Sequence, residues 1–128
     1  MNTKTLFTLA ASFNWLIALA LATIPGPLFS LFMVSPLPRE PLPMHLFAGL
    51  VFVFGIGYYW VSRNFETNIP IVKLGIVGKL SVVAVGLLEV LLGNISWQFM
   101  LLVSVDLVFA TLFILALQSA PASVLEEV

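Results

Sequence analysis

Residues 70–93, PIVKLGIVGKLSVVAVGLLEVLLG, form an apolar stretch that is long enough to span a bilayer, yet Lys79 and Glu89 lie well inside it. At helical spacing both charges share one stripe with small residues. The stripe consists of Gly75, Lys79, Val82, Gly86, Glu89 and Gly93. A charge at bilayer depth costs about 2.5 to 3.5 kcal/mol on insertion scales, so the stripe should face protein or trapped water. The stretch therefore predicts a small polytopic membrane protein with a polar interior.

Composition places the chain among membrane proteins. Of its 128 residues, 61% are hydrophobic and 9% are charged, against roughly 25% charged residues in soluble domains, and the mean hydropathy is +1.14. The net charge of −1 provides no basic field for nucleic acid and no polybasic segment for anionic headgroups. We expect membrane lipids as partners and no nucleic acid.

Cysteine is absent and histidine occurs once, which limits the chemistry of the chain. The lack of thiols excludes disulfides, thiolate nucleophiles, iron–sulfur clusters and cysteine-based zinc sites. The sequence also contains no zincin motif, nucleophile elbow, phosphate loop or paired-carboxylate motif. We predict no catalytic residues, no metal site and no cofactor, which favours a protein that is not an enzyme.

Four apolar segments each approach the ~20 residues that a spanning helix needs. They cover residues 5–24, 44–62, 70–93 and 97–117. Short connections at residues 63–68 and 94–96 make the segments that they join antiparallel neighbours. The sequence predicts an all-α integral membrane protein, an up-down four-helix bundle that forms a single domain of residues 1–128, with a Pro-rich outer loop after the first helix.

The first apolar segment carries a seam of small residues with one amide in it. The seam consists of Ala11, Asn14, Ala18 and Ala22. A charged start, an apolar run and the small residues at 20–22 also fit a cleavable signal peptide. Because the run is long for a signal peptide and Asn14 interrupts its centre, we favour a retained helix.

Prolines interrupt the chain between the first two spanning segments. They occur at positions 25, 27, 36, 38, 41 and 43, and each removes a backbone donor and disfavours helix in the preceding residue. The apolar run at residues 28–35 is too short to span. We expect it to lie in the membrane interface or to fold back under the bundle, with Arg39 and Glu40 in solvent.

The second apolar segment is expected to face inward along a stripe of Ala48, Phe52, Gly55 and Tyr59. An aromatic belt of Tyr58, Tyr59 and Trp60 marks the membrane interface at its end. His45 lies near the opposite interface. We expect His45 to be hydrogen-bonded or solvated rather than to carry protons.

Basic residues are distributed unevenly between the two ends of the bundle. Lys4, Arg63 and Lys73 fall on one side, and Arg39 alone falls in the loops of the other. By the positive-inside rule we expect both termini to be cytoplasmic and the Pro-rich loop to be outside.

Lys79 and Asp106 are expected to form an ion pair inside the membrane. At 1.5 Å per residue they lie about 12 Å and 17 Å from the cytoplasmic ends of their helices, and a lysine stem covers the difference. Pairing neutralises both charges in hydrocarbon. The candidate interior polar site comprises Lys79, Asp106, Asn14, Tyr58 and Tyr59. A candidate outer-side polar group comprises Glu89 with Arg39 or His45 as its partner.

Two interpretations of the interior site remain open. In the first, the pair fixes helix register and the protein is a structural, accessory or lipid-binding subunit that forms a homo-oligomer or joins a larger membrane complex. In the second, the site binds an anionic or polar headgroup or relays a proton, and the protein is a small-molecule or proton transporter or is enzyme-like. A directly bonded pair would favour the first interpretation, and a molecule in contact with the pair would favour the second.

Three stretches carry a family resemblance. Residues 58–64 end in Arg-Asn, residues 71–79 read I-V-K-L-G-x-x-G-K, and residues 106–113 read D-L-x-F-A-x-L-F. With the four helices and the Pro-containing loop, they resemble the small bacterial inner-membrane proteins of the DoxX-like kind. The resemblance implies an up-down four-helix bundle in the bacterial inner membrane. It also implies, as an alternative function, an association with quinone-linked oxidoreductases.

Overall fold

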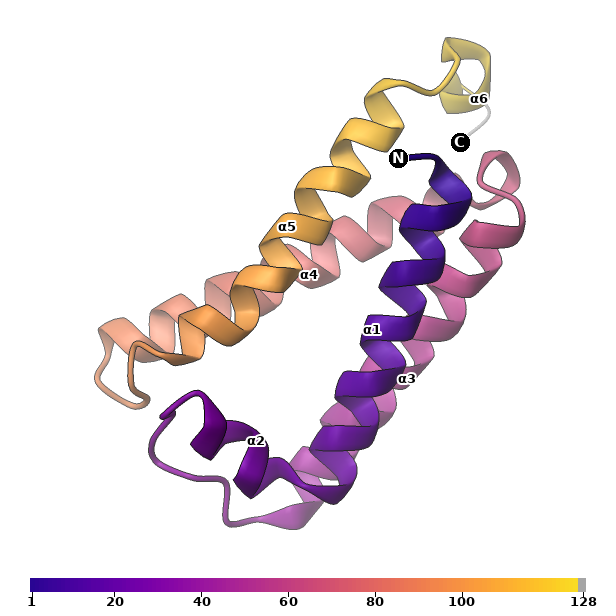
Figure 1. Ribbon diagram of the computed structural model, residues 1–128. Helices are drawn as coiled ribbons and strands as arrows, with labels where there is room; N and C mark the ends of the chain where they lie inside the picture. The colour runs from indigo at the N-terminus through magenta and orange to yellow at the C-terminus, as the bar shows by residue number, and fades with distance from the viewer. Residues whose placement is uncertain (127–128) are drawn as a thin grey trace.

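The computed structural model describes residues 1–126, and within that range it contains helices and no strands (Figure 1). Four helices are long and apolar enough to cross a membrane: α1 (Thr3–Thr23), α3 (Pro41–Arg63), α4 (Ile69–Leu91) and α5 (Phe99–Gln118). The described chain also contains α2 (Pro25–Leu31), η1 (Glu66–Asn68) and α6 (Ala122–Glu126). The predicted all-α fold with four spanning helices is confirmed.

The helix boundaries differ from the expected ones for local reasons. α3 begins at Pro41 rather than at residue 44, because a proline fits the first turn of a helix, where its missing N–H is not needed. α5 begins at Phe99 rather than at residue 97, because residues 94–98 form turns. The short apolar run after α1 folds back as α2, one of the two arrangements expected for it.

The spanning helices form two antiparallel pairs (Figure 1). α1 packs along α3, and α4 packs along α5, while contacts between the pairs are sparse. The pairs approach each other at the end that carries the start of α1 and η1, and they diverge toward the end that carries α2. The way in which the two helix pairs approach and diverge therefore determines which side chains meet in the interior.

α2 and the residues after it connect the two pairs at the diverging end. Phe29 of α2 is buried and packs edge-on against Phe99 of α5, with ring centroids 6.2 Å apart. The Ser96 N–H donates to the Ser35 carbonyl at 2.8 Å, and the Ser35 N–H donates to the Ser96 hydroxyl at 3.0 Å. The loop after α2 is thereby fixed to the turn between α4 and α5.

Aromatic side chains fill the end where the pairs approach each other. Phe7 of α1 is fully buried and stacks on Phe113 of α5, with centroids 4.4 Å apart. Tyr58 of α3 packs edge-on against Phe113 at 5.2 Å. Because lipid tails are as apolar as these rings, the cluster stabilises the bundle by close packing rather than by removal from water.

The inward stripe predicted for α4 agrees with burial in the structure. Gly75, Lys79 and Gly86 are buried, Val82 and Glu89 are half-buried, and Gly93 lies beyond the helix. On α1 the predicted seam is buried at Ala11, Asn14 and Ala18 but exposed at Ala22. Ala22 lies in the last turn of α1.

The stripe predicted for α3 is wrong at two of its positions. Phe52 and Tyr59 are 48% and 44% exposed, and Tyr58 is buried instead of lying in the expected aromatic belt. The cause is Trp15 of α1, whose ring lies so close to Gly55 that an added Cβ there would be 2.6 Å from it. Phe52 and Tyr59 pack against the Trp15 ring, with centroids 6.2 Å and 6.0 Å away, and they stay on the surface.

α2 and α4 end in the same hydrogen-bonding pattern. Met33 follows α2 with a φ of 57°, and Gly93 follows α4 with a φ of 77°. In each case the N–H groups of that residue and the next donate to carbonyls in the last turn, which is a Schellman motif. Glycine adopts this left-handed conformation freely, whereas for other residues it costs roughly 1–2 kcal/mol. The backbone is therefore strained at Met33 after α2 and not at Gly93 after α4.

Met33→Gly is expected to raise the free energy of unfolding by about 1 kcal/mol, because it removes this strain. The Met33 side chain is 69% exposed, so little packing is lost. Gly93→Ala is expected to lower the free energy of unfolding by a similar amount, and no atom lies within 4 Å of the added Cβ to contribute a clash. Thermal unfolding in detergent measures both changes.

Gly49→Ala is the matched control. Gly49 lies inside α3 with open space around it, so alanine should be neutral or stabilising there. The same sign of effect for Met33→Gly and Gly93→Ala would contradict the assignment of strain.

Candidate functional site

Lys79 of α4 and Asp106 of α5 form the ion pair expected from the sequence. The Lys79 ammonium donates to the Asp106 carboxylate at 2.7 Å, and the two side chains are 4% and 22% exposed. Lys79 lies ten residues from the start of α4 and Asp106 twelve residues from the end of α5, or about 15 Å and 18 Å from the same end of the bundle. The antiparallel packing of these helices brings both charges to a similar depth.

The Lys79 ammonium has a further polar partner and three aromatic neighbours. It donates to the Asn14 side-chain oxygen at 3.4 Å, and the Asn14 amide donates to the Val51 carbonyl at 3.0 Å. The ring centroids of Phe13, Tyr58 and Phe109 lie 5.8, 5.4 and 5.2 Å from Nζ, which are cation–π distances. One ammonium thus connects all four spanning helices.

The site carries no net charge, because the ammonium and the carboxylate cancel. Direct contact and the surrounding rings offset part of the cost of removing each charge from water. A buried pair of this kind adds little stability relative to apolar side chains of the same shape, but a single unpaired charge is costly. The pair therefore specifies how α4 and α5 align.

Tyr58 lies beside the pair because α4 has a glycine opposite it. A Cβ added at Gly75 would be 2.7 Å from the Tyr58 ring, so a larger residue would displace the ring. Tyr58 is 1% exposed, and its hydroxyl forms no hydrogen bond to any residue in the range 1–126. Within the same range, Oδ2 of Asp106 has no hydrogen-bond partner either. Two polar groups of the site are thus free to bind something else.

A cavity of about 440 Å³ lies between the two helix pairs and reaches the ion pair. All four spanning helices line it, and Phe29 of α2 lines it at the diverging end. Its polar lining comes from Asn14, Tyr58, Lys79, Ser81 and Asp106, and its other lining residues are apolar or glycine. The cavity is therefore an apolar space with a polar end.

The cavity opens sideways between α3 and α4. Phe47 and Leu50 line it although they are 41% and 61% exposed. An adjoining hollow of about 460 Å³ shares Phe47, Ser81, Val82 and Phe99 with the cavity. Since α3 and α4 are long and apolar enough to cross a membrane, this opening would face the acyl chains.

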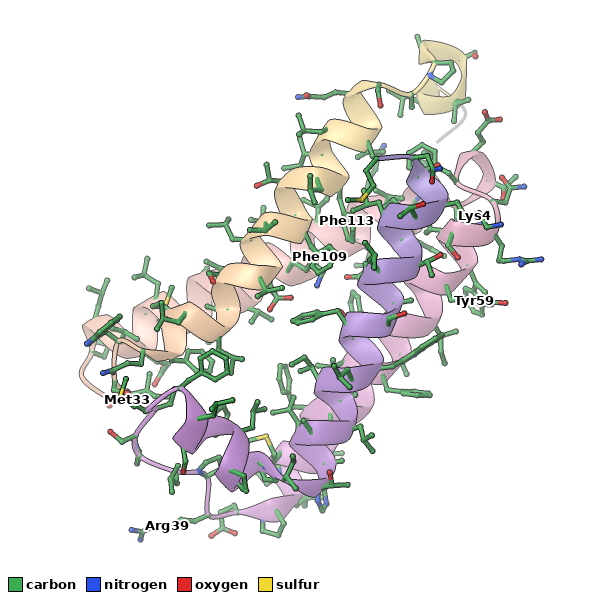
Figure 2. The ribbon with its side chains drawn as sticks, in the orientation of Figure 1. Lys4, Met33, Arg39, Tyr59, Phe109 and Phe113 are labelled. Carbon is green, nitrogen blue, oxygen red and sulfur yellow. The ribbon has the colours of Figure 1, made fainter. Side chains whose placement is uncertain are left out.

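Tyr59, which the sequence assigns to the interior site, lies outside it. It is 44% exposed, and its side chain points away from the bundle (Figure 2). Successive residues of a helix point about 100° apart, so the burial of Tyr58 places Tyr59 on the flank of α3. The expectation for Tyr59 is corrected accordingly.

The expected outer-side group of Glu89 with Arg39 or His45 does not form. Glu89 accepts a hydrogen bond from the Asn94 side chain at 2.8 Å. Arg39 and His45 are exposed, and the Arg39 side chain points away from the protein (Figure 2). The turn after α4 brings Asn94 back to Glu89, so the carboxylate finds its partner locally.

Two features of the site go beyond the sequence-based prediction: the ring faces around Lys79 and the cavity. Phe109 follows Asp106 by three residues, so helical spacing alone would place its ring near the carboxylate, whereas the position of Phe13 directly before Asn14 gives no such signal. The cavity depends on the divergence of the helix pairs, for which the residue pattern contains no signal.

Within residues 1–126, no group of three or more His, Asp or Glu side chains could hold a metal ion. Comparison of the chain with protein-family models, with curated proteins and with solved structures finds no match. Function must therefore be argued from the geometry of the ion pair and the cavity.

Lys79→Met and Asp106→Leu are each expected to lower the free energy of unfolding by about 3 to 5 kcal/mol, because each leaves one buried charge without its partner. The double variant should recover much of the loss, because it removes both charges. Equilibrium unfolding in detergent measures the coupling. Lys73→Met, at an exposed position on α4, serves as the control and should change stability by less than about 0.5 kcal/mol. Additive losses from the two single changes would show that the pair is not coupled.

Proposed function

We propose that this membrane protein binds an apolar molecule with a polar head group in the cavity between its helix pairs. The observation that carries the proposal is the cavity of about 440 Å³ whose apolar lining ends at Lys79, Asp106 and Tyr58. Small-molecule sites are typically about 300–1,000 Å³, mostly apolar, with a few placed polar groups. The size and the lining of this cavity both agree with that description.

The side opening supports a ligand that comes from the membrane itself. Its exposed residues, Phe47 and Leu50, belong to a spanning helix, so a ligand would pass from acyl chains into the cavity without crossing water. A lipid or another membrane-dissolved molecule fits this route. The lipid-binding interpretation of the sequence is thus the one that the geometry supports best.

Proton transport has less support. The Lys79 ammonium is held directly by the Asp106 carboxylate at 2.7 Å, and the directly bonded arrangement favours a packing or binding role. The aromatic cluster around Phe7 and Phe113 also fills the bundle between the pair and the end that carries η1. A proton path across the membrane would have to pass through that cluster.

An accessory role, in a homo-oligomer or a larger membrane complex, is a separate proposal. The small residues that motivate it lie on α1 and α4 and are used inside the bundle: Ala11 and Ala18 of α1 are buried, and Gly86 of α4 accommodates Phe99. An interface with another protein would therefore use the outward faces of the helices rather than these positions.

We also propose that the protein belongs to the DoxX-like kind and lies in the bacterial inner membrane with both termini in the cytoplasm. The four-helix arrangement supports the resemblance. Lys4 and Arg39 lie at opposite ends of the molecule, as the proposed orientation requires (Figure 2). A quinone-linked role would use the same cavity.

Val82→Trp is expected to weaken binding of 1-aminoanthracene, a small uncharged fluorescent probe, roughly tenfold or more, because the larger side chain fills the cavity. Fluorescence titration of the detergent-solubilised protein measures the affinity. Val77→Trp is the matched control, since Val77 is 63% exposed on the same helix and does not line the cavity. Equal loss of binding in the two variants, or no binding by the unaltered protein, would refute the proposed site.

The orientation can be tested by cysteine labelling, because the chain has no cysteine of its own. In spheroplasts, a membrane-impermeant maleimide is expected to label Leu37→Cys, in the loop before α3, and to label Thr67→Cys, in η1, only after lysis. The reverse pattern would show that the termini lie outside.

A further inference from the structure

If the cavity binds a ligand as proposed above, its charge balance determines which charge the head group of that ligand can carry. Among the residues that the structure describes, Lys79 and Asp106 are the only charged ones that line the cavity, and they are in direct contact with each other. A ligand with a charged head would therefore add an uncompensated charge at bilayer depth, which is costly. An uncharged head adds none.

The free hydrogen-bonding groups of the site specify the head group further. The Lys79 ammonium donates two of its three N–H groups, to Asp106 and Asn14, and it lies near three ring faces. Within residues 1–126, two other groups of the site have no partner: Oδ2 of Asp106, which only accepts, and the Tyr58 hydroxyl, which can donate. Both residues lie beside the same ammonium. The Asp106 carboxylate is 2.7 Å from Nζ of Lys79, and the centroid of the Tyr58 ring is 5.4 Å from it.

We infer that the cavity binds an uncharged amphiphile whose head is a hydroxyl group. The ligand hydroxyl donates to Oδ2 of Asp106 and accepts from the Tyr58 hydroxyl, so that both free groups are satisfied. The apolar part of the ligand lies along Val82 and Phe47 toward the opening between α3 and α4. A head that only accepts hydrogen bonds, such as a ketone or an ether, would leave the carboxylate oxygen unsatisfied.

The inference is tested with five compounds that share a twelve-carbon chain and differ in the head: dodecan-1-ol, 1-methoxydodecane, dodecane, dodecyl phosphate and dodecyltrimethylammonium. Each is added at the same mole fraction to the full chain in lipid nanodiscs, and the unfolding temperature is recorded. A ligand that binds the folded state raises this temperature. Val82→Trp, with its cavity filled, corrects for effects of each compound on the bilayer.

Dodecan-1-ol is expected to raise the unfolding temperature by roughly 5 °C in the unaltered protein and not in Val82→Trp. The ether and dodecane should bind at least tenfold more weakly, because neither can donate to a carboxylate. The two charged compounds should bind on the order of a hundredfold more weakly. Equal or tighter binding of a charged compound, the ether or dodecane would overturn the inference.

Tyr58→Phe provides the second measurement, with Tyr59→Phe as its matched control. Tyr58→Phe should weaken dodecan-1-ol about fivefold and leave dodecane unchanged, because it removes one hydrogen bond to the head. The hydroxyl has no partner in residues 1–126, so its removal leaves no protein group unsatisfied. Tyr59→Phe should not change the binding of either compound, because Tyr59 is 44% exposed on the flank of α3.

These results separate the inference from the proposed function. If 1-aminoanthracene binds in the cavity but dodecan-1-ol does not, the hydroxyl inference fails and the proposed function stands. If neither 1-aminoanthracene nor any of the five compounds binds, the proposed function itself fails.

Discussion

The need to neutralise two opposite charges in hydrocarbon is the constraint on which the rest of the structure depends. Lys79 is tolerated at mid-membrane because Asp106 lies 2.7 Å away, and this contact aligns α4 with α5. Glycine at position 75 of α4 then lets the Tyr58 ring approach the same ammonium. The pair contributes less as a source of stability than as a determinant of which residues meet in the interior.

The interior is divided into a packed half and a hollow half. On one side of the pair, rings from α1, α3 and α5 close the space between the helix pairs. On the other side the pairs diverge, and α2 with the residues after it connects them through Phe29 and the Ser35–Ser96 hydrogen bonds. The ion pair lies at the boundary, which gives the cavity its polar end.

The Lys79–Asp106 contact could be predicted from the sequence, whereas the inward face of α3, the partner of Glu89 and the cavity could not. The Lys79–Asp106 contact follows from two helices joined by a short turn, with charges at similar depth. The sequence predicts Tyr59 rather than Tyr58 in the interior because α3 is apolar on every side, so its pattern does not show which face points inward. The fit of Trp15 against Gly55 determines that face. The partner of Glu89 depends on the turn after α4, and the cavity depends on how the helix pairs diverge. Neither feature produces a periodic pattern in the sequence.

The contact between Lys79 and Asn14 has a consequence for the order in which the protein is made. A chain is synthesised from its N-terminus, so α4 emerges from the ribosome before α5 does, and Lys79 emerges before Asp106. Asn14 is already in place on α1 at that moment, and its side-chain oxygen lies 3.4 Å from the ammonium in the finished fold. Of the two polar partners of Lys79, the amide is therefore the one that is synthesised before the lysine, and the carboxylate is the one that follows it.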